Sequence, residues 1–235
     1  MRYCIDLHNH SCLSPCGENS LLPSILALEA AEKGVNILAL TDHNSAKNLQ
    51  AFKEAAEIVR ITPIFGIEIT TVEEVHLLSL FEHIEEALDF GDFLDNSLIK
   101  YKNDPSLFGD QLVVDVMGNI IEKVEHMLYG PSTYSFETLI DEILNRGGLA
   151  IPAHIDRPSN SVLANLGFLP ELPYSALELI MPSSLQSNSN YTIIQGSDAH
   201  YISHIARRSC FIEAKEPSFE GISQALLTKK VFLRS

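Results

Sequence analysis

Short apolar runs along this chain end repeatedly in histidine or in an acidic residue, and this pattern constrains the fold more than any other feature. Imidazole and carboxylate are the usual protein ligands of zinc, manganese and iron. Groups so far apart in sequence, each near a strand end, suit a barrel that collects strand termini around one point. The pattern therefore predicts a site for several metal ions and, with it, a hydrolase. Its motifs, which hold six of the nine histidines, are Asp6-Leu7-His8-Asn9-His10, Thr41-Asp42-His43-Asn44, Gly66-Ile67-Glu68, Glu74-Val75-His76, Pro152-Ala153-His154-Ile155-Asp156 and Gly196-Ser197-Asp198-Ala199-His200.

Strand and helix signals alternate along most of the chain. Apolar strand candidates cover residues 3–7, 36–40, 63–69, 76–81, 149–153, 176–181, 191–195, 210–213 and 231–233. Helical patterns cover residues 21–33, 46–59, 83–101, 136–145 and 219–227. This alternation predicts an α/β fold with a mainly parallel sheet. The polar segment 183–190 is expected to be a flexible loop.

The rhythm changes between about residues 83 and 131. A long helix, acidic early on and weakened by Gly91, is expected over 83–101. The segments 112–115 and 120–123, which each begin with apolar residues, flank a turn signal at 117–119, which favours a hairpin. The segment is too short to bury a core alone. We therefore expect one domain over residues 1–235 with an inserted helix-plus-hairpin segment at about 83–131.

Charge and composition restrict the partners. Sixteen basic residues against 31 acidic ones give a formal charge of −15. Such a surface repels phosphate backbones, so a long nucleic acid is not expected as a partner. A small phosphorylated substrate remains compatible, because bound divalent cations reverse the local sign of a site. The apolar runs are too short to cross a bilayer, so no membrane association is expected.

A cytoplasmic location is expected, because no secretory signal is visible at the N-terminus. The four cysteines are then not expected to form a disulfide framework. Cys12 and Cys16 are four residues apart, but no second cysteine pair follows, which disfavours a structural zinc site made of cysteines.

The single motifs are weak, and each has an ordinary structural alternative. His8 and His10 share one side of an extended chain, so both can reach one ion. Glu68 lies in an apolar strand, where a carboxylate is costly unless paired or bound to metal, and its two oxygens can bridge two ions. The alternatives are capped helix starts for the acids at 42 and 198, a solvent-facing strand end for Glu68, and satisfied core histidines at 76 and 154.

Taken in order, the motifs resemble those of the PHP (polymerase and histidinol phosphatase) superfamily. The resemblance runs from residue 6 to residue 200 and therefore covers most of the chain. It implies a distorted (β/α)7 barrel that holds two or three divalent metal ions at its C-terminal mouth and hydrolyses phosphate esters. It implies ligands for a first ion (His8, His10, Glu68 and Asp198), a second ion (His43 and His200) and a third ion (Glu68, His76 and His154).

The first motif departs from the pattern of this superfamily. Many relatives carry an aspartate or histidine near positions 15 and 16, where this chain has Pro15 and Cys16. Cys16 is either a thiolate ligand of the second ion, which would favour zinc or iron, or a lost ligand replaced by water.

Arginine residues near the motifs are candidates for substrate binding. Arg157 follows His154 by three residues and is the best candidate for a phosphate clamp, with a surface salt bridge as the alternative. Arg207 and Arg208 are weaker candidates, and the histidines at 83, 126 and 204 are interpreted as structural or exposed. The catalytic assignments are thus Glu68, Asp198 and Arg157.

The expected activity is hydrolysis of small phosphate esters by a water activated at two or three zinc, manganese or iron ions. Histidinol phosphate, nucleoside bisphosphates and short oligonucleotides all suit the superfamily. One alternative is a non-catalytic metal-binding module. The other is an amidohydrolase-type C–N hydrolase, which is disfavoured because no lysine stands at a strand end among the motifs. The oligomeric state is not indicated by the sequence.

Overall fold

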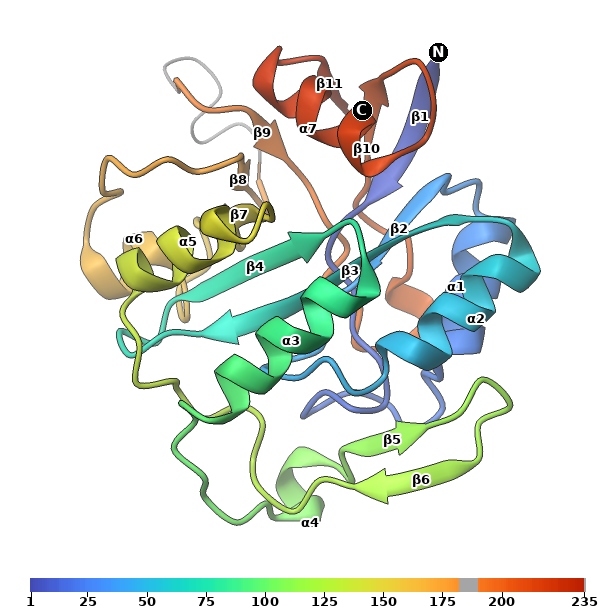
Figure 1. The fold of residues 1–235 in the computed structure, drawn as a ribbon, viewed down its shortest axis with the longest axis vertical. Coiled ribbons are helices and arrows are strands. Elements are labelled where there is room, and N and C mark those ends of the chain that lie inside the picture. Colours follow the sequence, from blue (N-terminus) through green and yellow to red (C-terminus); the bar gives the residue numbers. More distant parts are fainter. Residues whose placement is uncertain (182–189, 235) are drawn as a thin grey trace.

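A seven-stranded sheet forms the centre of the molecule and curls into a half-barrel (Figure 1). The computed structural model describes residues 1–181 and 190–234. The strand order is β11-β10-β1-β2-β3-β4-β7. A separate parallel pair, β8 (Leu177–Glu178) and β9 (Ile193–Ile194), contacts the two edge strands of this sheet, β8 at β7 and β9 at β11. The sheet strands are β1 (Arg2–Asp6), β2 (Ile37–Leu40), β3 (Thr62–Thr70), β4 (His76–Phe81), β7 (Leu149–Pro152), β10 (Cys210–Glu213) and β11 (Val231–Leu233).

The sheet is mixed, whereas the sequence predicted a mainly parallel one. Strands β1, β2 and β3 are parallel neighbours, but β4 runs antiparallel to both β3 and β7, and β10 runs antiparallel to β1. Only residues 71–75 connect β3 to β4. A parallel connection needs a crossover of a dozen or more residues, so this link permits only an antiparallel return. The α/β class is confirmed, and the strict βα repeat is broken at this point.

Helices pack on the sheet through apolar stripes. Alternate residues of one strand enter different core clusters: Leu38 and Leu40 join the helices α2 and α3, while Ile37 and Ala39 join residues of α7. Pro23 occupies the first turn of α1, where its missing N–H is not needed. The main helices are α1 (Pro23–Glu32), α2 (Leu49–Val59), α3 (Ile84–Asp95), α5 (Phe136–Asn145) and α7 (Phe219–Leu227).

The segment at 83–131 divides into two parts. Helix α3 buries Ile84, Phe90 and Leu94 and packs against β3 and β4, so it belongs to the layer of helices that covers the sheet. The chain then leaves this layer through a short helix α4 (Pro105–Phe108) and a hairpin of β5 (Leu112–Val114) and β6 (Ile120–Lys123). Asn48 fastens the hairpin to the barrel, because its side chain bonds the backbone of Leu112 and Val114. The interpretation of one domain with an insertion stays a prediction.

Other elements differ from the sequence-based ranges in detail. The expected strands at 176–181 and 191–195 shorten to β8 and β9. Short helices at α6 (Val162–Leu166) and at the 3-10 helix η2 (Ile202–His204) were not expected. The predicted loop at 183–190 lies outside the described residues, apart from Asn190. Within the described part of the chain, no helix is long and apolar enough to span a membrane.

Candidate metal centre

The candidate ligands gather at one end of the sheet, where β1, β2 and β3 terminate. His8 and His10 follow β1, His43 follows β2, and Glu68 lies near the end of β3. Strand β4 runs the opposite way, so its first residue, His76, reaches the same end. His154 follows β7, and Asp198 and His200 follow β9. Asn9 and Ala199 form a bridge that brings the first and last motifs side by side.

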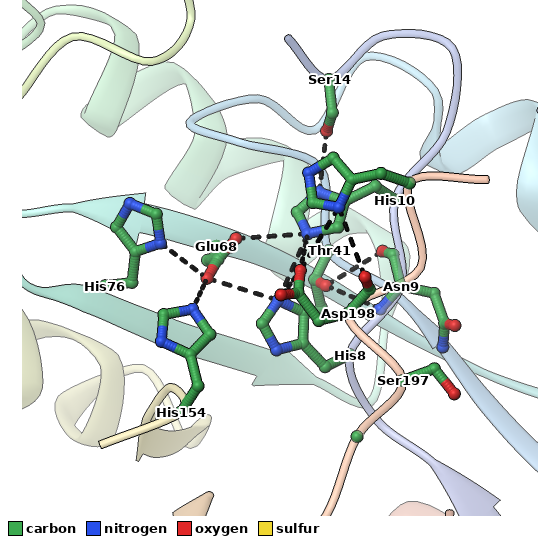
Figure 2. Close-up of polar contacts among 12 residues, drawn as sticks. His8, Asn9, His10, Ser14, Thr41, Glu68, His76, His154, Ser197 and Asp198 are labelled. Carbon is green, nitrogen blue, oxygen red and sulfur yellow. Dashed lines mark hydrogen bonds and ion pairs between the residues drawn. The ribbon is translucent and has the colours of Figure 1, made fainter. Parts of the chain in front are cut away.

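Glu68 lies at the centre of this site (Figure 2). The carboxylate is completely buried, and five imidazole rings surround it. Its Oε1 lies 2.9 Å from His76 Nδ1, 3.0 Å from His154 Nε2 and 3.3 Å from His8 Nε2. Its Oε2 lies 3.2 Å from His10 Nε2 and 3.1 Å from His43 Nδ1.

Asp198 forms a second carboxylate centre beside the first. Its Oδ1 lies 3.3 Å from His10 Nε2, 3.4 Å from His200 Nδ1 and 3.6 Å from His8 Nε2. Three sets of residues have ligand atoms that all lie within 4.8 Å of one another. The sets are His8, His10, Glu68 and Asp198; His10, His43 and His200; and His43, Glu68 and His76. Cys16 is in none of these sets, and it is exposed.

The donors of the site fit divalent metal ions. Glu68 Oε2, Asp198 Oδ1 and His43 Nδ1 are buried and have no hydrogen-bond partner among the described residues. Buried polar atoms are nearly always hydrogen-bonded, so several that converge on one place and have only ion-pair contacts need an explanation. A mixture of imidazole nitrogens and carboxylate oxygens is a donor set that zinc, manganese and iron accept.

Burial and neighbouring charges set the protonation of these ligands. Burial, together with the proximity of His10, lowers the pKa of His200 to about 3. Burial likewise holds the pKa of His43 well below its usual range. Burial alone would raise the pKa of Glu68, but His76, His8 and His43 hold it well below its usual range. Neutral imidazole and ionised carboxylate are the forms that bind metal.

His8 differs from His43, His76 and His200, because its pKa is raised, as is that of His10, whereas theirs are lowered. Burial alone would lower its pKa, but Glu178, Glu68 and Asp198 together raise that pKa well above the usual value. This proton is the one that a bound cation would replace, because a metal ion occupies the place of a positive charge among the carboxylates.

Several buried polar residues support the ligands, and sequence reasoning had not assigned them this role. The Nδ1 atom of His10 lies 2.8 Å from Ser14 Oγ, and that hydroxyl donates to Asp42 Oδ1 at 2.7 Å. Asp42 also accepts from the backbone and hydroxyl of Ser11, so it does not cap the following helix. Asp6 accepts from both the backbone N–H and the hydroxyl of Ser197.

Glu178 is the supporting residue that the sequence could have revealed. It is a buried acid in the apolar stretch Ala176–Leu179, which is the same signal that singled out Glu68. Its Oε2 lies 2.8 Å from His8 Nδ1. Metal-binding histidines commonly donate their second N–H to a carboxylate in this way.

A cavity of about 400 Å³ opens onto the ligands. Arg157, Arg207 and His204 line it together with His43 and His200. Arg157 Nη1 lies 3.5 Å from Asp198 Oδ2, so its partner is a candidate ligand rather than a surface acid. Arg207 is fixed by the carbonyls of residues 197 and 198, whereas Arg208, His83 and His126 do not line the cavity.

Aromatic residues from the segment after α3 form another part of the cavity wall. Phe108 and Tyr129 line it beside Cys16. The Tyr129 ring packs edge-on against His43, with ring centroids 5.2 Å apart, and against His76 at 5.7 Å. A larger depression of about 870 Å³ near Met1 and Lys230 contains none of the candidate ligands, so we attach no chemistry to it.

Comparison with known families agrees with this geometry. The model of the PHP domain matches residues 6–148, which is more than half of the 235-residue chain. The chain belongs to the PHP domain family. The predicted resemblance is thereby confirmed.

A curated relative matches this PHP chain over a short segment only. A 5'-3' exoribonuclease of Haemophilus influenzae is 38% identical over 78 residues, which are 32% of this chain and 27% of that protein. The matched segment therefore covers about a quarter of the length of this curated relative.

Solved structures show the same fold. A lesion-specific endonuclease from Pyrococcus furiosus superposes with a TM-score of 0.72 at 18% identity, over 99% of this chain and 58% of that one. A Bifidobacterium adolescentis protein, to which metal-dependent phosphoesterase activity is provisionally assigned, superposes with a TM-score of 0.56 at 17% identity, over 96% of both chains. At these identities the likeness concerns the fold alone.

Proposed function

We propose that this PHP chain is a metal-dependent hydrolase of phosphate esters. The observation that carries the proposal is the Glu68 carboxylate, completely buried among five imidazoles at one end of the sheet. Membership of the PHP family supports it. A buried charge in such surroundings is costly as a structural feature alone, and it is useful as a ligand shared by two ions.

We assign the ligands as follows. His8, His10, Glu68 and Asp198 would hold a first ion, and Glu68 with His76 and His154 would hold a third. His43 and His200 would hold a second ion, with His10 close to both. Cys16 lines the cavity together with His43 and His200. It would be a further ligand of the second ion, or else a water molecule takes that place.

Bound ions would supply Lewis acidity toward a water molecule and toward the phosphate oxygens. The residues of the chain bind and orient the substrate. Arg157 and Arg207 are the cationic side chains of the cavity, and Asp198 is the only acid among the described residues that line it. The cavity is therefore suited to an anionic group despite the net charge of −15 for the whole chain.

The substrate in this proposal is a small phosphate ester or the end of a short oligonucleotide. A cavity of about 400 Å³ accommodates a group of that size next to the ligands. A similar exoribonuclease and an endonuclease of the same fold act on nucleic acid, which favours a nucleic-acid substrate. The strongly negative charge of the chain disfavours extended contact with a long polynucleotide.

The test is a hydrolysis screen with protein loaded with manganese, zinc or iron. The panel contains phosphomonoesters, nucleoside bisphosphates, short single-stranded oligonucleotides and long duplexes. We expect metal-dependent turnover of the small substrates, which a chelator abolishes. Absence of turnover above the chelated control across the whole panel overturns the proposal, and stoichiometric metal without turnover would identify a non-catalytic module. Turnover of a lactam instead would identify a C–N hydrolase, although no lysine lines the cavity in the described part of the chain.

A further inference from the structure

A buried carboxylate behind the ligands, Glu178, links parts of the site that the assigned roles leave separate. Only 2% of its surface is exposed, and it belongs to none of the three ligand sets. We propose that Glu178 is a positioning residue that orients His8 and His154 for metal binding at once. This inference rests on the metal centre of the proposed function.

The first contact of Glu178 fixes the tautomer of His8. Glu178 Oε2 lies 2.8 Å from His8 Nδ1, and a carboxylate oxygen accepts, so the proton of the neutral ring stays on Nδ1. The Nε2 lone pair then faces Glu68 Oε1 and Asp198 Oδ1, at 3.3 Å and 3.6 Å. Without this acceptor the ring could carry its proton on Nε2, where it would exclude a metal ion.

The second contact of Glu178 holds the backbone of His154. The same Oε2 accepts from the His154 backbone N–H at 2.8 Å, and the Glu178 carbonyl accepts from the next N–H, that of Ile155, at 2.9 Å. The backbone of His154 has φ +29°, a conformation that residues other than glycine rarely adopt. Its Nε2 nevertheless reaches Glu68 Oε1 at 3.0 Å, and its ring stacks on His8 with centroids 5.6 Å apart (Figure 2).

The segment before Asp198 is fitted to the same carboxylate. A Cβ atom at Gly196 would lie 2.3 Å from Glu178 Oε1, so only glycine permits this close approach. Gly196 precedes Asp198 by two residues. Glu178 therefore lies directly behind segments that carry ligands of the first and the third ion.

Two variants separate the roles of Glu178. Glu178→Leu removes the acceptor at similar size, and Glu178→Gln keeps an oxygen and removes the charge. Loss of a carboxylate that supports a metal-binding histidine typically weakens metal binding by about 10- to 100-fold, and we expect Leu near the upper end and Gln near the lower end. The matched control is Asp156→Asn, a nearby acid whose side chain accepts from the backbone of Ile180 and Met181.

Manganese and zinc affinities are measured by competition with a chelator. The tautomer of His8 is measured by nitrogen NMR of the metal-free protein at a pH high enough to make the ring neutral, because the pKa of His8 is raised. We expect weaker binding in both variants, loss of the Nδ1–H tautomer in Glu178→Leu, and parent-like values for Asp156→Asn. If Glu178→Leu does not fold, the metal affinities of Glu178→Gln still test the inference. The inference is overturned if Glu178→Gln binds both metals within about twofold of the parent. A parent protein that binds metal without hydrolysing phosphate esters contradicts the proposed activity and leaves this test valid. An Nε2–H tautomer of the neutral His8 ring in the parent also overturns the inference about Glu178, whatever the substrate.

Discussion

At the scale of single residues, the environment of Glu68 is the strongest sign of function in this chain. The carboxylate has no exposed surface, and its close partners at the site are imidazoles rather than arginine or lysine. An arginine pair would have satisfied a purely structural carboxylate by two parallel hydrogen bonds. Imidazoles are weaker partners for a carboxylate, but they are good ligands for the metal ions that a carboxylate also binds.

The substitution Glu68→Gln keeps the shape of the side chain and removes its charge. We expect the metal content to fall by more than one ion per chain and the activity to collapse, because Glu68 is placed between two ligand sets. Elemental analysis of protein dialysed against limiting metal measures this directly. Glu213→Gln on the surface is the control. Full metal content in Glu68→Gln would remove Glu68 from the bridging role.

Arg157 contributes binding of the substrate in our proposal. Arg157→Ala should lower kcat/KM by about tenfold to a hundredfold, because a hydrogen bond to a charged group contributes roughly 1.5–3 kcal/mol. Arg157→Lys should recover only part of this loss, since an ammonium lacks the guanidinium fork. Metal content must be measured alongside, because Arg157 also lies 3.5 Å from Asp198. Parent-like kinetics for Arg157→Ala, within about twofold, would reduce its role to that of an ion-pair partner.

At the scale of elements, the antiparallel pair of β3 and β4 builds the middle of the site. Its register places Thr70 opposite His76, and this arrangement carries His76 Nδ1 to within 2.9 Å of Glu68 Oε1. Ser79 and Leu80 of β4 press closely on Gly66 of β3. The glycine of the Gly66-Ile67-Glu68 motif therefore has a packing role two residues before the ligand.

Gly66→Ala should weaken this strand pair. The added Cβ would lie 2.6 Å from the Ser79 carbonyl oxygen and 2.7 Å from Leu80 Cδ2, and backbone cannot move aside as a flexible side chain does. Overpacking of this kind costs about 1–3 kcal/mol in the free energy of unfolding. Urea denaturation of the metal-free protein measures the loss, with Thr62→Ala at the start of β3 as the control. A stability equal to that of the parent would show that β4 shifts without cost.

Helix α3 shows how an element can be predicted well at one end only. The expected helix over 83–101 begins within one residue of its predicted start, at Ile84, but it ends at Asp95. Leu94 is its last buried residue, and Leu98 instead forms a bridge with Ser132. Pairing with a segment distant in sequence thus ends the helix before the local helical pattern ends, and helix propensity does not predict such pairing.

At the scale of the whole molecule, the ligands make the stability of the metal-free protein depend on pH. The pKa of His200 is about 3 in the folded chain, because burial and the neighbouring His10 disfavour its charged form, against 6.5 for a free histidine. Between these values the unfolded chain binds a proton that the folded chain does not take up. Stability should therefore fall as the pH decreases from about 6.5 to about 3.

The variant His200→Asn tests this dependence, because asparagine does not titrate. Its free energy of unfolding should fall less steeply than that of the parent over the same pH window, when both are measured by urea denaturation in the presence of a chelator. His8 and His10 contribute in the opposite direction, since their pKa values are raised, and both residues remain in the variant. Parallel pH profiles of the two proteins would contradict the assignment to His200.

Local signals in the sequence predicted the candidate ligands, the α/β class and most helices and strands. Helix α5 and strands β4, β10 and β11 have the predicted bounds. These features depend on apolar periodicity and on polar residues at the ends of apolar runs, which neighbouring residues alone define. The likeness to the PHP family, now confirmed, rested on the same motifs.

The tertiary structure alone decided the direction of the strands, the partners of each ligand and the residues that support them. No local pattern shows that β4 returns antiparallel and presents its first residue to the site, or that Arg157 faces Asp198. Nor does any pattern pair Glu178 with His8, because 170 residues separate them in the chain. A hydrogen bond between distant residues forms only when the whole sheet closes, so its geometry belongs to the fold and not to any segment of the sequence.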